Sequence, residues 1–149
     1  MQTSGTTCNP KLVLLTHANI LSAARGIVRA FGLGPDDLCF NPMPLHHVHG
    51  LISAGISSLL ATSTCYLTSS FTPKSFNAAY ARLQPTWFTA SPAMHLALLE
   101  YYRTSSVPAN PRLKFVRSSS APLPAALIAE LEALFHAPLI ETYGLTETA

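Results

Sequence analysis

The first eleven residues gather side chains that can hold a phosphate group. Hydroxyl groups, a glycine and a lysine occur together at Thr3, Ser4, Gly5, Thr6, Thr7 and Lys11. Hydroxyls donate hydrogen bonds to oxyanions, a glycine lets backbone amides turn towards them, and an ammonium group neutralises their charge. The stretch therefore predicts an oxyanion-binding loop. A solvated loop of the same composition is the alternative that this stretch alone leaves open.

Further polar clusters each follow a short apolar run. They are His46, His47 and His49, then residues 118–120, and then residues 143–147. The histidines suggest a metal site, but structural zinc generally needs four ligands and no cysteine pair lies near them, so metal binding is disfavoured. The serines of residues 118–120 could equally form a polar turn before a helix. Glu147 could equally be a carboxylate in the first turn of a helix.

The apolar pattern predicts the elements that must position these clusters. Helices are expected at residues 16–31, 72–83, 91–102 and 124–135, with another ending near residue 60, and strands at residues 38–43, 65–67, 86–90, 113–117 and 139–142. Such alternation indicates an α/β fold, a mostly parallel sheet covered by helices on both faces. Ligands of these sheets bind outside the carboxyl ends of the strands, where the polar clusters are expected to emerge.

The chain carries few charges for its length. Of its 149 residues, 11% are charged and 48% are hydrophobic, whereas a soluble domain has about 25% charged residues. We expect a partner, or a remainder of the same polypeptide, to cover part of the apolar surface. The net charge of +2 forms no basic stripe, which argues against nucleic acid. Neither a secretory signal nor a transmembrane segment of ~20 apolar residues is visible, so an intracellular, non-secreted protein is expected.

Four motifs, in this order, resemble the acyl-adenylate-forming (AMP-binding) superfamily. The opening loop is similar to its phosphate-binding signature, residues 44–50 to the segment beside its acyl pocket, residues 117–123 to its adenine loop, and residues 143–147 to its Tyr-Gly-x-Thr-Glu motif. The resemblance covers essentially the whole chain and is greatest for ligases that join oxalate, other small acids or fatty acids to CoA. It implies that residues 1–149 are part of the large N-terminal adenylation domain, an incomplete subdomain without the C-terminal lid domain.

The resemblance also implies a reaction. Such acid–thiol ligases use ATP to activate a carboxylic acid as acyl-AMP, with Mg²⁺ as cofactor, and transfer the acyl group to CoA as co-substrate. The chain would then be a catalytically incomplete segment of an acyl-CoA synthetase, inactive alone. A non-catalytic remnant, or a weak nucleotide- or partner-binding module, is the alternative. A small-molecule carboxylic acid is the implied partner, and the cytoplasm or peroxisome the implied location.

The family's site residues can be carried over position by position. The residues implied to bind the nucleotide are Thr3, Ser4, Gly5, Thr6, Thr7, Lys11, Ser119, Ser120, Ala121, Pro122, Tyr143, Gly144 and Thr146. Those implied to act in catalysis are Lys11, Thr146 and Glu147, with Glu147 as the Mg²⁺ ligand. The opening loop would hold the β- and γ-phosphates, residues 119–122 would line the adenine, Tyr143 would stack on it, and Thr146 would reach the α-phosphate. His47 would stand between the nucleotide and acyl sites.

Overall fold

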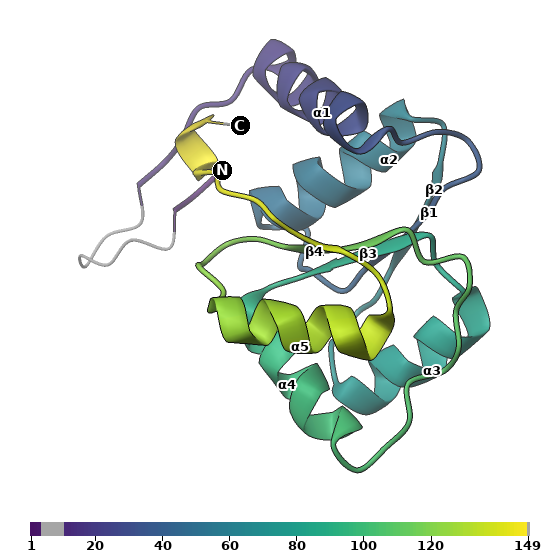
Figure 1. Ribbon diagram of the computed structural model, residues 1–149. Coiled ribbons are helices and arrows are strands. Elements are labelled where there is room, and N and C mark those ends of the chain that lie inside the picture. Colours follow the sequence, from purple (N-terminus) through teal and green to yellow (C-terminus); the bar gives the residue numbers. More distant parts are fainter. Residues whose placement is uncertain (4–10, 149) are drawn as a thin grey trace.

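A parallel five-stranded sheet forms the centre of the computed structural model, which describes residues 1–3 and 11–148 (Figure 1). The strands are β1 (Leu38–Asn41), β2 (Thr64–Leu67), β3 (Trp87–Ala90), β4 (Phe115–Ser118) and β5 (Leu139–Glu141). They lie side by side in the order β2-β1-β3-β4-β5, and each neighbouring pair is parallel. The α/β fold class expected from the sequence is confirmed.

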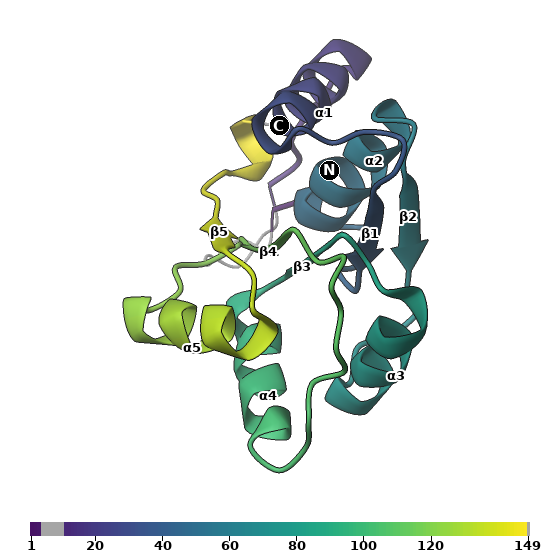
Figure 2. The same ribbon diagram turned by 45° about the vertical axis from the view of Figure 1, so that its right-hand side comes forward.

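Helices cover both faces of the sheet, as Figure 2 shows from a second direction. One face carries α1 (His17–Phe31), the π-helix η1 (His49–Ile56) and α2 (Ser57–Leu60), which continues η1. The opposite face carries α3 (Pro73–Leu83), α4 (Pro92–Tyr102) and α5 (Ala125–Phe135). A short 3₁₀-helix, η2 (Thr146–Thr148), follows β5. The covering of both faces was expected, but the wide turns of η1 were not.

Local side-chain signals fix where the helices begin and end. Thr16 and Asn19 form a capping box at the start of α1, where the Asn19 backbone N–H donates to Thr16 Oγ1 over 3.2 Å. Thr72 and Ser75 form the same arrangement before α3. The helix α1 ends at Gly32, whose φ of 59° lies in the left-handed region that favours glycine. These caps explain why the sequence pattern located both helices closely.

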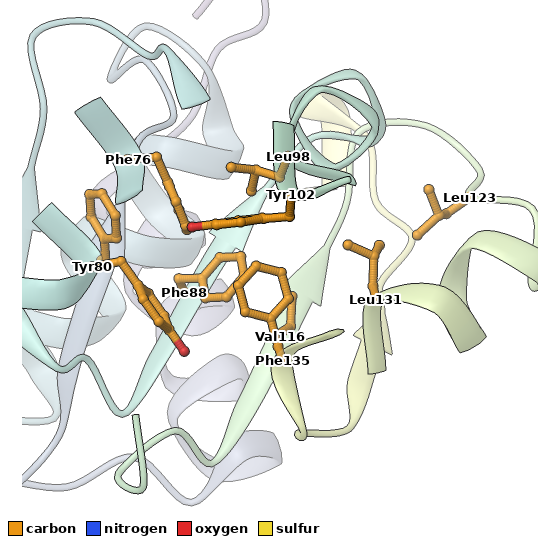
Figure 3. Packing of buried hydrophobic residues seen from close by; sticks show 10 residues of the cluster. Phe76, Tyr80, Phe88, Leu98, Tyr102, Val116, Leu123, Leu131 and Phe135 are labelled. Carbon is orange, nitrogen blue, oxygen red and sulfur yellow. The ribbon is translucent and has the colours of Figure 1, made fainter. Parts of the chain in front are cut away.

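The strands supply two hydrophobic cores because successive side chains point to opposite faces. Trp87 and Phe115 pack under α1, with ring centroids 5.4 Å apart. Their neighbours Phe88 and Val116 point to the other face and pack with Phe135 against α3, α4 and α5 (Figure 3). The buried members of this larger core are Phe40, Phe76, Tyr80, Phe88, Leu98, Tyr102, Val116, Leu123, Leu131 and Phe135. The two cores hold the sheet rigidly between its helices.

The Asp37 carboxylate ties together the amino ends of three strands. It accepts hydrogen bonds from Thr86 Oγ1 and Lys114 Nζ, each at 2.7 Å, and from the Gly34 backbone N–H at 2.9 Å. Asp37, Thr86 and Lys114 directly precede β1, β3 and β4. Burial by itself would raise the pKa of Asp37, but the hydrogen bonds from Lys114, Gly34 and Thr86 outweigh it and lower that pKa. The ionised carboxylate is thus part of the folded structure.

We expect Asp37→Ala to lower the free energy of unfolding by about 2 kcal/mol at pH 7, because it removes the carboxylate partner of Lys114 and leaves the buried Thr86 hydroxyl with only its longer bond to the Leu38 carbonyl. Urea denaturation followed by circular dichroism measures the change. Glu100→Ala is the matched control, since the ion pair of Glu100 with Arg103 has side chains that are 72% and 69% exposed. That control should change stability by less than about 0.5 kcal/mol. Equal losses in the two variants would contradict the role of Asp37.

Candidate functional site

The loops that leave the carboxyl ends of the strands line one cavity of about 950 Å³. Pro44 follows β1, Ser91 follows β3, Ser119 follows β4 and Thr142 follows β5, and all of them line it. One face of α1, which includes Phe31, closes the cavity from the side. A cavity of this size at this edge of a parallel sheet is the position in which such folds hold small ligands.

Many of the residues expected at the site do meet in this cavity. Those that line it are Thr3, His47, Ser119, Ser120, Tyr143, Gly144, Thr146 and Glu147. Lys11, Ala121 and Pro122 are described by the structure but do not line the cavity. Ser4, Gly5, Thr6 and Thr7 lie outside the described residues, so their part in an oxyanion loop stays a prediction.

The segments on either side of residues 4–10 pair with each other. The Thr3 backbone N–H donates to the Lys11 carbonyl over 3.0 Å, and the Lys11 N–H donates to Thr3 Oγ1 over 3.3 Å. The Val13 N–H donates to the Met1 carbonyl over 2.7 Å. Gln2 and Thr3 also line the cavity. The pairing therefore brings both ends of the predicted oxyanion loop to the mouth of the site.

A connected row of polar groups forms one wall of the cavity. His49 Nε2 lies 2.5 Å from Thr89 Oγ1, and His49 Nδ1 lies 2.9 Å from Ser120 Oγ. Arg117 Nη1 lies 3.4 Å from the same Thr89 oxygen. His49, Arg117 and Ser120 line the cavity, whereas Thr89 is fully buried behind them. These residues come from η1, β3, β4 and the loop after β4, and only the assembled sheet brings them together.

Burial lowers the pKa values of the titratable residues in this wall and so determines which of them are charged. It lowers the pKa of His49 to about 3, with a smaller contribution from the positive charge of Arg117. It also lowers the pKa of Arg117 to about 10. At neutral pH His49 is therefore neutral, while Arg117 keeps its positive charge. Burial and the neighbouring His46 likewise lower the pKa of His47, the histidine expected near the acyl site.

The backbone at Ser120 is held in an unfavourable conformation. Its φ of 85° lies in the left-handed region, which a serine side chain rarely adopts. Such a residue costs about 1–3 kcal/mol and persists where its surroundings fix it. The contact between His49 Nδ1 and the Ser120 hydroxyl is part of what fixes it here. Strain of this kind is commonly found at ligand-binding positions.

Sequence reasoning named some of the wall residues without giving them this role. The sequence pattern places His49 among the candidate metal ligands and in the segment similar to that beside the family's acyl pocket. It places Arg117 at the end of a strand and at the start of the loop similar to the family's adenine loop, and Thr89 within a strand. The sequence nonetheless carries a signal for Arg117. This residue stands in a nearly continuous apolar strand, and a charged residue in such a strand is rarely buried without a partner. Thr89 and Arg117 also share the face of Trp87 and Phe115 by strand alternation.

The described residues offer little for a metal ion by themselves. Across residues 1–3 and 11–148, no group of three or more His, Cys, Asp or Glu side chains could hold one. Glu147 is the one carboxylate among the described residues that line the cavity. Mg²⁺ binds to one or two carboxylates together with phosphate oxygens, so Glu147 fits a Mg²⁺ that arrives with a nucleotide.

No helix in the described part of the chain is both long enough and apolar enough to cross a bilayer.

The fold and the cavity define an α/β unit with a ligand-sized site at the carboxyl ends of a parallel sheet. A model of the family described as AMP-binding enzyme matches residues 1–149, and the chain belongs to this family, as its motifs indicated. It is 37% identical to a probable CoA ligase from Humulus lupulus over 100% of this chain, and 36% identical to an oxalate–CoA ligase from Arabidopsis thaliana over 99% of it.

A solved structure agrees with these sequence relatives. The crystal structure of ATP-bound MatB from Rhodopseudomonas palustris matches 99% of this chain with a TM-score of 0.87 and 31% identity. The matched region is 29% of that protein, and the chain likewise spans 29% of the length of the two plant relatives. The two plant relatives are thus named as CoA ligases, and this chain corresponds to somewhat under a third of the length of each.

Proposed function

We propose that this chain is the part of an ATP-dependent acid–CoA ligase that holds the nucleotide and the acid. The observation that supports this most is the convergence of separate motifs on one cavity. Residues far apart in the sequence, such as Thr3, His47, Ser119 and Tyr143, all line it. Convergent polar groups in a single large cavity are what a nucleotide site requires. The relatives named as CoA ligases and the ATP-bound neighbour support the same reading.

The proposed reaction has two steps. An oxygen of the acid's carboxylate attacks the α-phosphorus of ATP, and the bond from this phosphorus to the bridging oxygen breaks, so that acyl-AMP forms and pyrophosphate leaves. The thiol of CoA then loses its proton and attacks the acyl carbon, which forms the thioester and releases AMP. Alignment of the reactants and neutralisation of phosphate charge account for most of the rate in such reactions.

Different residues of the chain serve different parts of this reaction. Residues 3–7 and Lys11 bind the β- and γ-phosphates and orient pyrophosphate as the leaving group. Residues 119–122 pass along the adenine, and Tyr143, whose side chain is 92% exposed, has a ring face free to stack on it. Thr146 donates a hydrogen bond to the α-phosphate. Mg²⁺ held by Glu147 supplies further neutralisation of phosphate charge when bound.

We expect Tyr143→Ala to weaken AMP binding about 5- to 150-fold, because stacking of a base on an aromatic ring contributes about 1–3 kcal/mol. The exposure of Tyr143 means that its loss should leave the fold intact. Tyr143→Phe keeps the ring and is the matched control, with an expected change of less than about twofold. Titration calorimetry with AMP and ATP measures both affinities. Failure of the unmodified chain to bind AMP at millimolar concentration would overturn the proposal.

A binding module without catalysis is the second candidate, favoured by the position of Lys11, which the structure describes but which does not line the cavity. Exchange of labelled pyrophosphate into ATP, measured with and without oxalate, separates the two. Oxalate-dependent exchange that is lost in Lys11→Ala supports a ligase. AMP binding without exchange, both in this chain and in a chimera that carries it in place of the aligned segment of the Arabidopsis thaliana ligase, supports the binding module.

A further inference from the structure

Within residues 1–3 and 11–148, Arg117 is a buried cation without a carboxylate partner. The residue is 4% exposed and lines the cavity. All seven Asp and Glu residues of the chain lie in its described part, where the ion pairs join Lys114 to Asp37 and Arg103 to Glu100. Arg117 Nε has no hydrogen-bond partner among residues 1–3 and 11–148. Burial of an uncompensated charge costs several kcal/mol, so this arrangement points to an anion that the cavity receives.

The groups that do contact Arg117 are neutral. Its guanidinium carbon lies 5.9 Å from the ring centroid of Phe31, and its Nη1 lies at the long distance of 3.4 Å from Thr89 Oγ1. A contact with an aromatic face is a weak attraction and leaves the net charge in place. These contacts hold the side chain at the cavity wall. They do not replace a counterion.

The neighbouring hydrogen bonds leave a further donor, the Ser120 hydroxyl, available at the cavity. Thr89 Oγ1 accepts from Arg117 Nη1, so its one hydrogen goes to His49 Nε2. Because His49 is neutral, its own ring hydrogen is then on Nδ1 and is donated to Ser120 Oγ. This assignment of the tautomer follows from the network. The hydroxyl hydrogen of Ser120 is left for a ligand, as is the unpaired Nε–H of Arg117, and both residues line the cavity.

We infer that Arg117, together with the Ser120 hydroxyl, binds the second carboxylate of a short dicarboxylic acid such as oxalate, while its first carboxylate reacts with ATP. The inference rests on the proposed function, because it names the acid of that reaction. A planar guanidinium presents parallel N–H groups that match the two oxygens of a carboxylate. An acid with a purely aliphatic tail would leave the same charge buried and unpaired. Arg117 is therefore a residue that determines specificity.

The test follows the Arg117 Nε–H directly by NMR in the full 149-residue chain labelled with ¹⁵N-arginine, in the presence of AMP. Arg117→Lys, in which this signal is missing, assigns it. Sodium oxalate is expected to shift the signal in a saturable manner, with an affinity at least about tenfold higher than that of acetate, because a hydrogen-bonded charge pair is formed. Arg117→Gln is expected to lower the affinity for oxalate to that for acetate. The exposed Arg112→Gln is the matched control and should keep the preference.

The outcomes separate this inference from the proposed function. If the wild-type chain binds AMP but binds oxalate and acetate equally, or if oxalate leaves the Arg117 signal unmoved, the inference is wrong and the proposed function stands. If the wild-type chain does not bind AMP, both are wrong. AMP affinity also reports whether Arg117→Gln has folded. The wild-type titration decides the question even if that variant does not fold.

Discussion

Gly50→Ala is expected to lower the free energy of unfolding by about 3 kcal/mol or more. A Cβ atom at this position would lie 2.4 Å from the Pro44 carbonyl oxygen and 2.7 Å from that of Met43. Both are backbone atoms, so neither can move aside as a flexible side chain would. The Asn41 side-chain amide also donates to the Gly50 carbonyl over 3.0 Å and fixes η1 against the end of β1. The clash must therefore displace η1 or the loop before it.

Gly26→Ala is the matched control for this substitution. A Cβ there would meet nothing within 4 Å, and Gly26 lies inside α1. Alanine favours a helix over glycine by about 0.5–1 kcal/mol, so this variant should be as stable as the wild type or slightly more stable. Urea denaturation of both variants measures the difference. If Gly50→Ala proved as stable as Gly26→Ala, the close approach of η1 to residues 43–44 would be wrong.

Acid is expected to destabilise the fold between about pH 6.5 and pH 4 through two buried histidines. Burial lowers the pKa of His49 to about 3 and that of His95 to about 4, whereas an unfolded chain has histidine pKa values near about 6.5. Below that value the unfolded state binds more protons than the folded state does. Stability is then complete above pH 6.5 and declines on acidification, by up to about 1.4 kcal/mol per pH unit for each histidine.

Urea midpoints measured at pH 7, 6 and 5 test this dependence. His49→Gln should flatten the slope, because it removes one of the groups that take up a proton on unfolding. His17→Gln removes an exposed histidine at the start of α1 and should leave the slope unchanged. A midpoint that stays constant from pH 7 to pH 5 would show that His49 and His95 take up protons in the folded state as readily as in the unfolded chain, which contradicts the lowered pKa values.

The elements were predictable because their signals are local. Thr16 and Thr72 cap helices together with residues only three positions further on, so the pairs that form the caps can be recognised in the sequence. The alternation of elements also predicted a parallel sheet with its polar loops at one edge. The π-helix η1 was not predictable, since its wide turns accompany a close approach between Gly50 and the Pro44 carbonyl that no periodicity encodes.

The site was predictable in part for the same reason. Family motifs located Tyr143, Thr146 and Glu147 at the cavity, because a motif carries its own local geometry. Arg117 and Thr89 became partners only through strand register, which sets them side by side on β4 and β3. Register depends on how whole strands pair and cannot be read from either strand alone. The pairing of Arg117 with Thr89 is therefore the part of the site that the sequence pattern leaves hidden.

The wall formed by His49, Thr89, Arg117 and Ser120 also bears on how fast the site forms during folding. Its contacts join residues that are far apart in the sequence. The separation is 71 positions between His49 and Ser120 and 28 positions between Thr89 and Arg117. Contacts between such distant residues form slowly, because the chain must first bring its ends together. The wall exists only after β1, β3 and β4 have paired. Selective oxalate binding would thus report on completed folding of the sheet as well as on chemistry.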